Sequence, residues 1–229
     1  MSIALLERAA SALDDLLKEV VFLGGATVGL WITDPAAPEP RPTKDVDVIV
    51  EVTSRGRFAE FEERLRAHGF REDQESGIIC RWRHGDDLIL DAMPTDASIL
   101  GFENRWQAAA VPFAVSRELP SGSLIAAVPP PFLLATKLEA FASRGAEDYV
   151  ASRDMADVIS LLDGRAELVD ELAGSPDGLR TYVVGELARH RGHPRFLDGV
   201  YGGLLPDAAS QDRAGLIVLP RIATIIDAT

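Results

Sequence analysis

Two aspartates, Asp45 and Asp47, lie two residues apart in an apolar stretch, a spacing that suits the binding of a cation. They alternate with Val46, Val48 and Val50, and this alternation predicts a β-strand. Side chains two residues apart point to the same face of a strand, roughly 7 Å from each other. The two carboxylates therefore predict a metal site, and the chemistry of such a site would be that of phosphate groups. The alternative is the solvated face of an edge strand, which needs no metal.

A third aspartate, Asp91, stands alone in the apolar segment 88–93. A charge within an apolar strand is costly unless it is paired or binds a metal. We therefore expect Asp91 to be the third carboxylate of the metal site. The alternative is a buried ion pair between Asp91 and a nearby arginine, such as Arg81 or Arg83.

A Gly-Gly turn, Gly24-Gly25, follows a short apolar strand predicted over 20–23 and precedes a helix predicted over 26–32. Glycine lets backbone N–H groups approach a phosphate without a Cβ in the way, and the start of a helix favours an anion. The turn therefore predicts a phosphate contact. A tight turn between a strand and a helix that binds no ligand would have the same sequence.

The same turn also imitates the fingerprint of dinucleotide-binding folds, because glycines stand at Gly24 and Gly29 and acids follow about 20 residues later. The match fails at Ala26, which takes the place of the middle glycine. It fails again because Asp45 and Asp47 begin their strand, whereas the ribose-binding acid should end it. A nicotinamide-binding oxidoreductase is therefore the weaker interpretation of this turn.

Lys137 lies among apolar residues of a helix predicted over 132–142, and Asp154 and Asp157 share a helix predicted over 152–162. A lysine in this position can neutralise a triphosphate, or its side chain can extend along the helix to solvent. Asp154 and Asp157 are three residues apart and lie on one side of their helix. A solvated helix face is the simplest interpretation of that pair.

The composition restricts the class of protein. Of the 229 residues, 47% are hydrophobic and only one is a cysteine, which fits a globular protein of the reducing cytoplasm. No apolar segment is long enough to span a membrane, so we expect no membrane partner. The net charge of −13, from 36 acidic and 23 basic residues, opposes broad nonspecific binding of nucleic acid. A local basic strip can still bind one RNA end.

The three prolines Pro129-Pro-Pro131 separate a mixed region from a helical one. We expect strands at 20–23, 45–52, 78–83, 88–93, 111–117 and 123–128, and helices at 3–19, 26–32, 57–68, 132–142, 152–162, 166–173 and 176–190. The strands 78–83 and 88–93 should form an antiparallel hairpin across a turn at 84–87. The predicted fold class is α/β (α+β), with a mixed β-sheet flanked by helices. Residues 1–128 would form the core domain, and residues 129–229 a helical C-terminal region that closes a nucleotide cleft.

The order of these motifs resembles that of the AbiEii-type nucleotidyltransferases, a toxin-like branch of the polymerase-β-like nucleotidyltransferase superfamily. The resemblance covers about residues 20–163. It rests on Gly24-Gly25, on Arg41-Pro-Thr-Lys-Asp45-Val-Asp47, on the segment around Lys137 and on Arg153-Asp154-x-x-Asp157. It implies that Asp45, Asp47 and Asp91 are catalytic and bind metal, and that Gly24, Gly25, Lys137 and Asp154 bind the nucleotide.

The resemblance also implies an activity, namely Mg²⁺-dependent transfer of an NMP from an NTP to an acceptor hydroxyl. Two Mg²⁺ ions, or Mn²⁺ in their place, are the implied cofactors. Many such proteins are toxins of toxin-antitoxin pairs and some modify tRNA, so a tRNA 3′ end and an antitoxin protein are the expected partners besides the NTP. The sequence leaves three alternatives open: a small-molecule (aminoglycoside-like) nucleotidyltransferase, an NAD(P)-binding oxidoreductase, and a degenerate, non-catalytic nucleotide-binding module.

Overall fold

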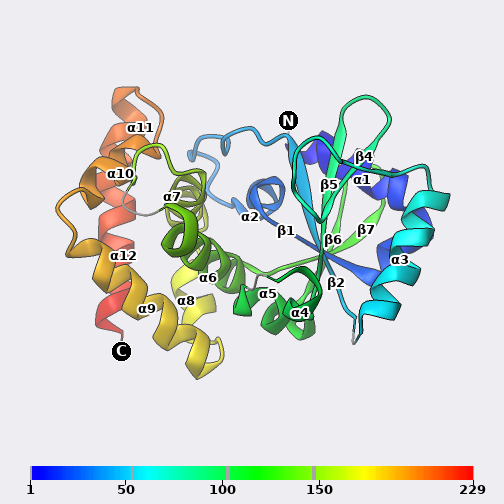
Figure 1. Cartoon of the computed structure of the whole chain (residues 1–229). Coiled ribbons are helices and arrows are strands. Elements are labelled where there is room, and N and C mark those ends of the chain that lie inside the picture. Colours follow the sequence, from blue (N-terminus) through cyan, green and yellow to red (C-terminus); the bar gives the residue numbers. More distant parts are fainter. Residues whose placement is uncertain (1, 53, 102–103, 146–147, 229) are drawn as a thin grey trace. The chain divides into compact units, whose positions relative to one another are not determined.

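The computed structural model describes residues 2–52, 54–101, 104–145 and 148–228 (Figure 1). The chain forms two compact units, one from residues 1–30 and 42–129 and the other from 31–41 and 130–229. The first unit contains a mixed sheet with helices, and the second is helical. The predicted α/β fold class with a helical C-terminal region is therefore confirmed.

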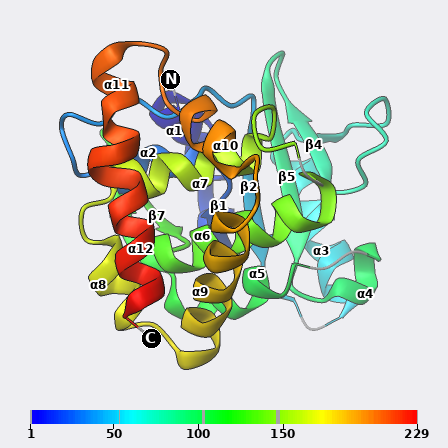
Figure 2. The ribbon, with the colours of Figure 1, turned by 90° about the vertical axis from the view of Figure 1, so that its left-hand side faces the viewer.

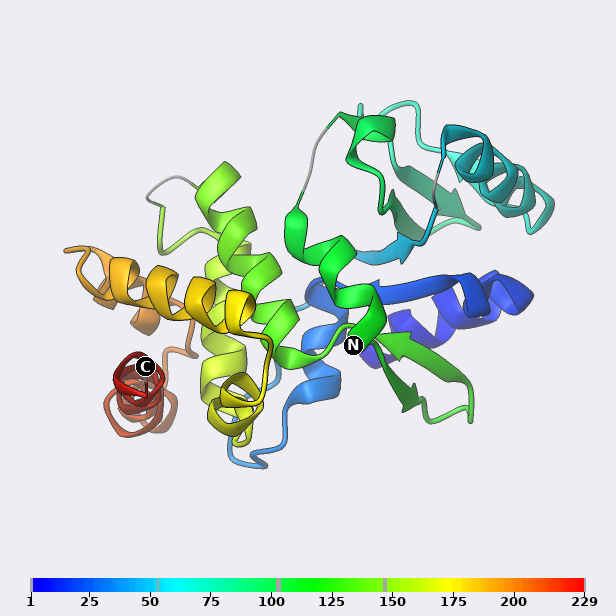
Figure 3. The same ribbon diagram turned by 90° about the horizontal axis from the view of Figure 1, so that it is seen from below.

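The described part of the first unit contains a seven-stranded sheet in the order β3-β4-β5-β2-β1-β7-β6. The strands are β1 (Val20–Leu23), β2 (Asp45–Val50), β3 (Arg71–Glu72), β4 (Arg81–His84), β5 (Leu88–Pro94), β6 (Val115–Glu118) and β7 (Leu124–Ala127). Strand β2 runs parallel to β5 and β1 runs parallel to β7, whereas the other neighbours are antiparallel. The predicted β4–β5 hairpin is confirmed. A second hairpin, β6–β7, forms the end of the sheet and is green in Figure 3.

Strand β2 has one apolar and one polar side over its first half. Val46 and Val48 are fully buried, whereas Asp45 and Asp47 are partly exposed. This burial follows the period of two that the sequence shows. The sheet therefore buries the valines in the core and leaves the two aspartates on its other face.

The helices of the first unit are α1 (Ser2–Leu13), α2 (Val28–Trp31), α3 (Arg55–Ala67), α4 (Ala97–Leu100) and α5 (Arg105–Ala110). Helix α1 contacts β2 and β5. It ends earlier than the predicted helix 3–19, because Asp14 adopts a left-handed φ of 48° and residues 14–19 continue as a 3₁₀-helix. The predicted helix 26–32 is also shorter, since residues 25–27 form a 3₁₀ turn before α2.

The second unit contains α6 (Pro130–Ala140), α7 (Arg153–Gly164), α8 (Leu168–Ala173), α9 (Asp177–Arg191), α10 (Phe196–Gly202), α11 (Ala208–Arg213) and α12 (Leu219–Asp227). Helix α6 packs against α7 and α9, and α9 lies beside α12 (Figure 2). The first four helices of this unit were predicted, within a few residues at each end. Among the described residues, no helix combines the length and the apolar character that a membrane span requires.

The proline-rich loop 31–41 packs within the second unit. The backbone N–H groups of Thr33 and Asp34 donate to the carbonyl oxygen of Gly164 at 2.9 and 3.0 Å. Arg213 bridges Asp34 and Asp163, at 2.6 and 2.8 Å. These contacts hold the loop to the end of α7, although the loop interrupts the first unit in sequence.

An aromatic cluster in the second unit surrounds His190, which is fully buried. The Tyr149 hydroxyl lies 2.8 Å from Nδ1 of His190, and the rings of Phe141 and Phe196 pack against the imidazole. Burial, assisted by the positive charge of Arg189, lowers the pKa of His190 to about 4. This histidine is therefore neutral at pH 7 and belongs to the core.

The buried histidine predicts a loss of stability in acid. Between pH 6.5 and about 4 the unfolded chain binds a proton at His190 that the folded chain does not, so the free energy of unfolding falls as the pH falls. The difference between the two pKa values corresponds to about 3 kcal/mol. Urea unfolding across this pH range should show a slope that His190→Gln removes. Because burial is the main cause, Tyr149→Phe should keep the slope; a wild-type slope in His190→Gln would contradict this assignment.

Candidate active site

Three aspartates come together on one face of the sheet in the first unit. Asp47 of β2 and Asp91 of β5 are paired residues of two parallel neighbouring strands. Paired residues point to the same face, with backbones about 5 Å apart. Asp45 precedes Asp47 by two residues and shares that face. The structure thus places the three predicted metal ligands on one face of the sheet.

The positively charged side chain of Arg81 lies beside these aspartates, because Arg81 of β4 is the paired residue of Asp91 across the hairpin. Its Nε donates to Asp91 Oδ1 at 2.8 Å and its Nη2 to Asp91 Oδ2 at 2.7 Å. The same Nη2 lies 3.1 Å from Asp45 Oδ2. The hydrogen bonds to Asp91 raise the pKa of Arg81 against the opposing effect of burial. Arg81 is therefore the arginine partner that the sequence suggested for Asp91, and it lies among the three aspartates.

The Gly-Gly turn adjoins these carboxylates, because Leu23 of β1 pairs with Asp47 of β2. Gly24 follows with a φ of 79°, a conformation that favours glycine. A Cβ at Gly24 would lie 1.8 Å from Asp47 Oδ2, so no other residue fits without displacing the carboxylate. The turn is closed by Thr27, whose backbone N–H and hydroxyl both donate to Gly24 O, at 3.2 and 3.0 Å.

The residues of this site suit a divalent cation. Three carboxylates supply the oxygen ligands that Mg²⁺ prefers, and with Arg81 among them the group keeps two negative charges. Thr43 donates from Oγ1 to Asp45 Oδ1 at 2.7 Å, which orients that carboxylate. We name Asp45, Asp47 and Asp91 the carboxylate triad.

The dinucleotide-binding interpretation is contradicted by the sheet topology. A dinucleotide-binding turn connects a strand through its helix to a parallel neighbouring strand. Here β1 is followed by β2, and the two strands pair in antiparallel fashion. The Gly24–Gly29 segment therefore does not belong to a βαβ unit, and the oxidoreductase alternative falls with it.

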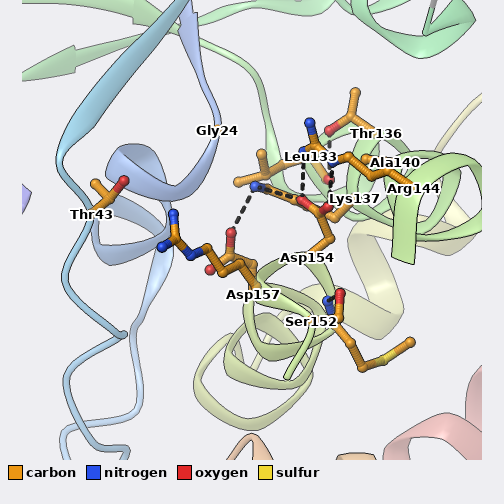
Figure 4. A network of polar contacts seen from close by, with 12 residues as sticks. Gly24, Thr43, Leu133, Thr136, Lys137, Ala140, Arg144, Ser152, Asp154 and Asp157 are labelled. Carbon is orange, nitrogen blue, oxygen red and sulfur yellow. Dashed lines mark hydrogen bonds and ion pairs between the residues drawn. The ribbon is translucent and has the colours of Figure 1, made fainter. Parts of the chain in front are cut away.

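A second polar group lies within the helical unit, between α6 and α7 (Figure 4). Lys137 Nζ lies 3.3 Å from Asp154 Oδ1 and 2.7 Å from Asp157 Oδ2. Lys137, Asp154 and Asp157 are 7%, 5% and 1% exposed. The interpretation of the two aspartates as a solvated helix face is therefore wrong, and Lys137 does not extend to solvent.

Two arginines also belong to this group, which therefore has three cations and two carboxylates. Arg144 donates to Asp154 through Nε and Nη2, at 2.9 and 3.0 Å. Arg41, from the loop 31–41, contacts Asp157 at 2.9 Å and also donates to the carbonyl oxygen of Arg153 at 3.3 Å. Burial alone would raise the pKa of Asp154, but the Arg144 hydrogen bonds and the charge of Lys137 hold it below its usual value. Asp154 is therefore ionised at neutral pH.

The pairing of Arg41 with Asp157 was not predicted from the sequence. The two residues are 116 positions apart, and no helical or strand spacing connects them. The Arg81–Asp91 pair differs, because both residues lie on one predicted hairpin. Strand register is therefore a usable signal for the Arg81–Asp91 pair but not for the Arg41–Asp157 pair.

Comparison with known proteins assigns the chain to a family. The family model described as "Nucleotidyl transferase AbiEii toxin, Type IV TA system" matches residues 4–208, which include every predicted site residue. No curated protein matches the chain. The family consists of nucleotidyl transferases, and the chain is accordingly a transferase of a type whose members generally use divalent metals. The chain belongs to the AbiEii nucleotidyl transferase toxin family of type IV toxin-antitoxin systems.

Proposed function

We propose that this chain transfers an NMP from an NTP to the 3′ end of a tRNA, and that an antitoxin protein restrains it in the cell. The observation that carries the proposal is the carboxylate triad beside the Gly24 turn, in which Asp47 and Asp91 are paired across parallel strands. The family match supports the reaction class and the toxin role. The NTP, the tRNA and the antitoxin are the partners that we propose.

Each side chain of the triad has a role in the proposed reaction. Asp45 and Asp47 would hold two Mg²⁺ ions, with Asp91 as a third carboxylate that serves the second ion and accepts the proton of the attacking hydroxyl. When bound there, Mg²⁺ would neutralise triphosphate charge and would lower the pKa of that hydroxyl. The hydroxyl oxygen forms a bond to the α-phosphorus, and pyrophosphate leaves. Positioning and charge neutralisation would supply most of the rate enhancement.

The remaining predicted residues would bind the nucleotide. The backbone of the Gly24-Gly25 turn can approach a phosphate, because neither residue carries a Cβ. Lys137 would provide a cation for the triphosphate, and Asp154 would hold the ammonium in place through their 3.3 Å contact. Asp154 and Asp157 each have an arginine, Arg144 or Arg41, as a further partner besides Lys137.

Growth of a bacterial host tests the proposed function. Expression of the wild-type chain alone should slow growth, because a blocked tRNA 3′ end stops translation, whereas Asp45→Ala should allow normal growth. The matched control is Asp86→Ala, an exposed aspartate of the β4–β5 turn, which should be as toxic as wild type. Sequencing of tRNA 3′ ends should find added nucleotides only in the two toxic strains. Normal growth and unmodified tRNA with an active enzyme would instead indicate a small-molecule acceptor.

A further inference from the structure

Arg81 makes more contacts with the carboxylate triad than a single ion pair has. Its guanidinium engages both oxygens of Asp91 in a bidentate pair and also reaches Asp45. The side chains of Arg81 and Asp91 are only 16% and 11% exposed. Bidentate arginine-carboxylate pairs are among the strongest hydrogen-bonded contacts in proteins, and little water is available here to replace this one.

The charges of the triad indicate what Arg81 does to metal binding. Three carboxylates carry three negative charges, and the guanidinium neutralises one of them. Arginine does not lose its proton in proteins, so this cation can leave the triad only by moving. A divalent ion that uses Asp91 must therefore displace the Arg81 fork or share its oxygens.

We propose that Arg81 competes with the second divalent ion for Asp91, so that the two ions of the site bind with unequal affinity. This inference rests on the proposed function, in which the triad binds metal. The first ion binds at Asp45 and Asp47 and displaces only the single 3.1 Å contact of Arg81 with Asp45, while the guanidinium stays on both oxygens of Asp91. The complete two-ion site forms only when the guanidinium has moved, and Arg81 is thus a positioning residue that controls the assembly of the site.

Titration with Mn²⁺, with free ion followed by electron paramagnetic resonance, tests the proposal without any enzyme assay. The wild-type chain should bind one ion tightly and a second ion at least about tenfold more weakly. Arg81→Gln should tighten the second ion by about tenfold or more, a factor comparable to the effect of a neighbouring arginine on proton binding by a carboxylate. The matched control is Arg83→Gln, on the same strand, because Arg83 pairs with Asp73 instead of the triad. It should bind Mn²⁺ as wild type does.

Two further measurements keep the test decisive if Arg81→Gln does not fold. Arg81→Lys retains a charge but cannot form the fork, and should give an intermediate affinity for the second ion. In the wild-type chain, the Nε–H resonance of Arg81 should shift when Mg²⁺ fills the second site and stay in place when only the first is filled.

Equal affinities of wild type and Arg81→Gln for the second ion, or an unmoved Nε–H resonance at saturation, would overturn the role of Arg81. The proposed function would survive that result if Asp47→Asn still weakened the first ion. Failure of the wild-type chain to bind Mn²⁺ at all would contradict both the role of Arg81 and the proposed metal site.

Discussion

Asp47→Asn should abolish nucleotide transfer while the protein remains folded. The substitution removes one metal ligand and with it several kcal/mol of transition-state stabilisation. That loss corresponds to a decrease in rate of about a thousandfold or more. The fold should persist, because asparagine has nearly the same shape and the change relieves repulsion from the neighbouring carboxylates, Asp45 and Asp91. Release of pyrophosphate measures the activity, and thermal unfolding followed by circular dichroism measures the stability.

Asp86→Asn is the control for this experiment, since Asp86 is exposed in the β4–β5 turn and lies outside the triad. It should retain wild-type activity. Transfer at the wild-type rate by Asp47→Asn would show that the sheet carboxylates are not the catalytic site.

Gly24→Ala should damage both stability and activity, because the new Cβ has no room. At 1.8 Å from Asp47 Oδ2, it must push the carboxylate away or distort the turn. Left-handed strain and the forced displacement together should lower the free energy of unfolding by about 3 kcal/mol, and nucleotide transfer should be lost with the position of Asp47.

Gly122→Ala separates the two causes of that effect. Gly122 has a similar φ of 86°, but a Cβ there would meet nothing within 4 Å. This variant should therefore lose only about 1–2 kcal/mol from backbone strain and should keep its activity. Equal unfolding energies for the two variants, measured in urea, would mean that the contact between Gly24 and Asp47 is unimportant.

The carboxylate triad of the sheet was predictable because its signals are local. A period of two places Asp45 and Asp47 on one face, and the turn at 84–87 identifies the β4–β5 hairpin. Asp91 could be recognised because it is the one charge in an apolar strand. The parallel pairing of β2 with β5 could not be predicted, because the strands are joined by a long connection that contains α3, β3 and β4.

The polar group of the helical unit was predicted less well, because its contacts join distant segments. The pattern at Asp154 and Asp157 is that of a solvated face, yet both are buried because Lys137, Arg144 and Arg41 neutralise them. The short helices α4, α5, α10 and α11 were missed as well. Each has seven residues or fewer, so that little helical period can emerge, although the six-residue helix α8 was predicted.

The most direct test of the account is nucleotide transfer by the purified chain. The wild-type protein is incubated with Mg²⁺, total bacterial RNA and each of the four NTPs labelled at the α-phosphate. We expect label at the 3′ end of RNA of tRNA size, no label when Mg²⁺ is removed with a chelator, and no label with Asp47→Asn. Absence of label with every NTP, together with no release of pyrophosphate by the folded wild-type protein, would contradict the central claim that the carboxylate triad catalyses nucleotidyl transfer.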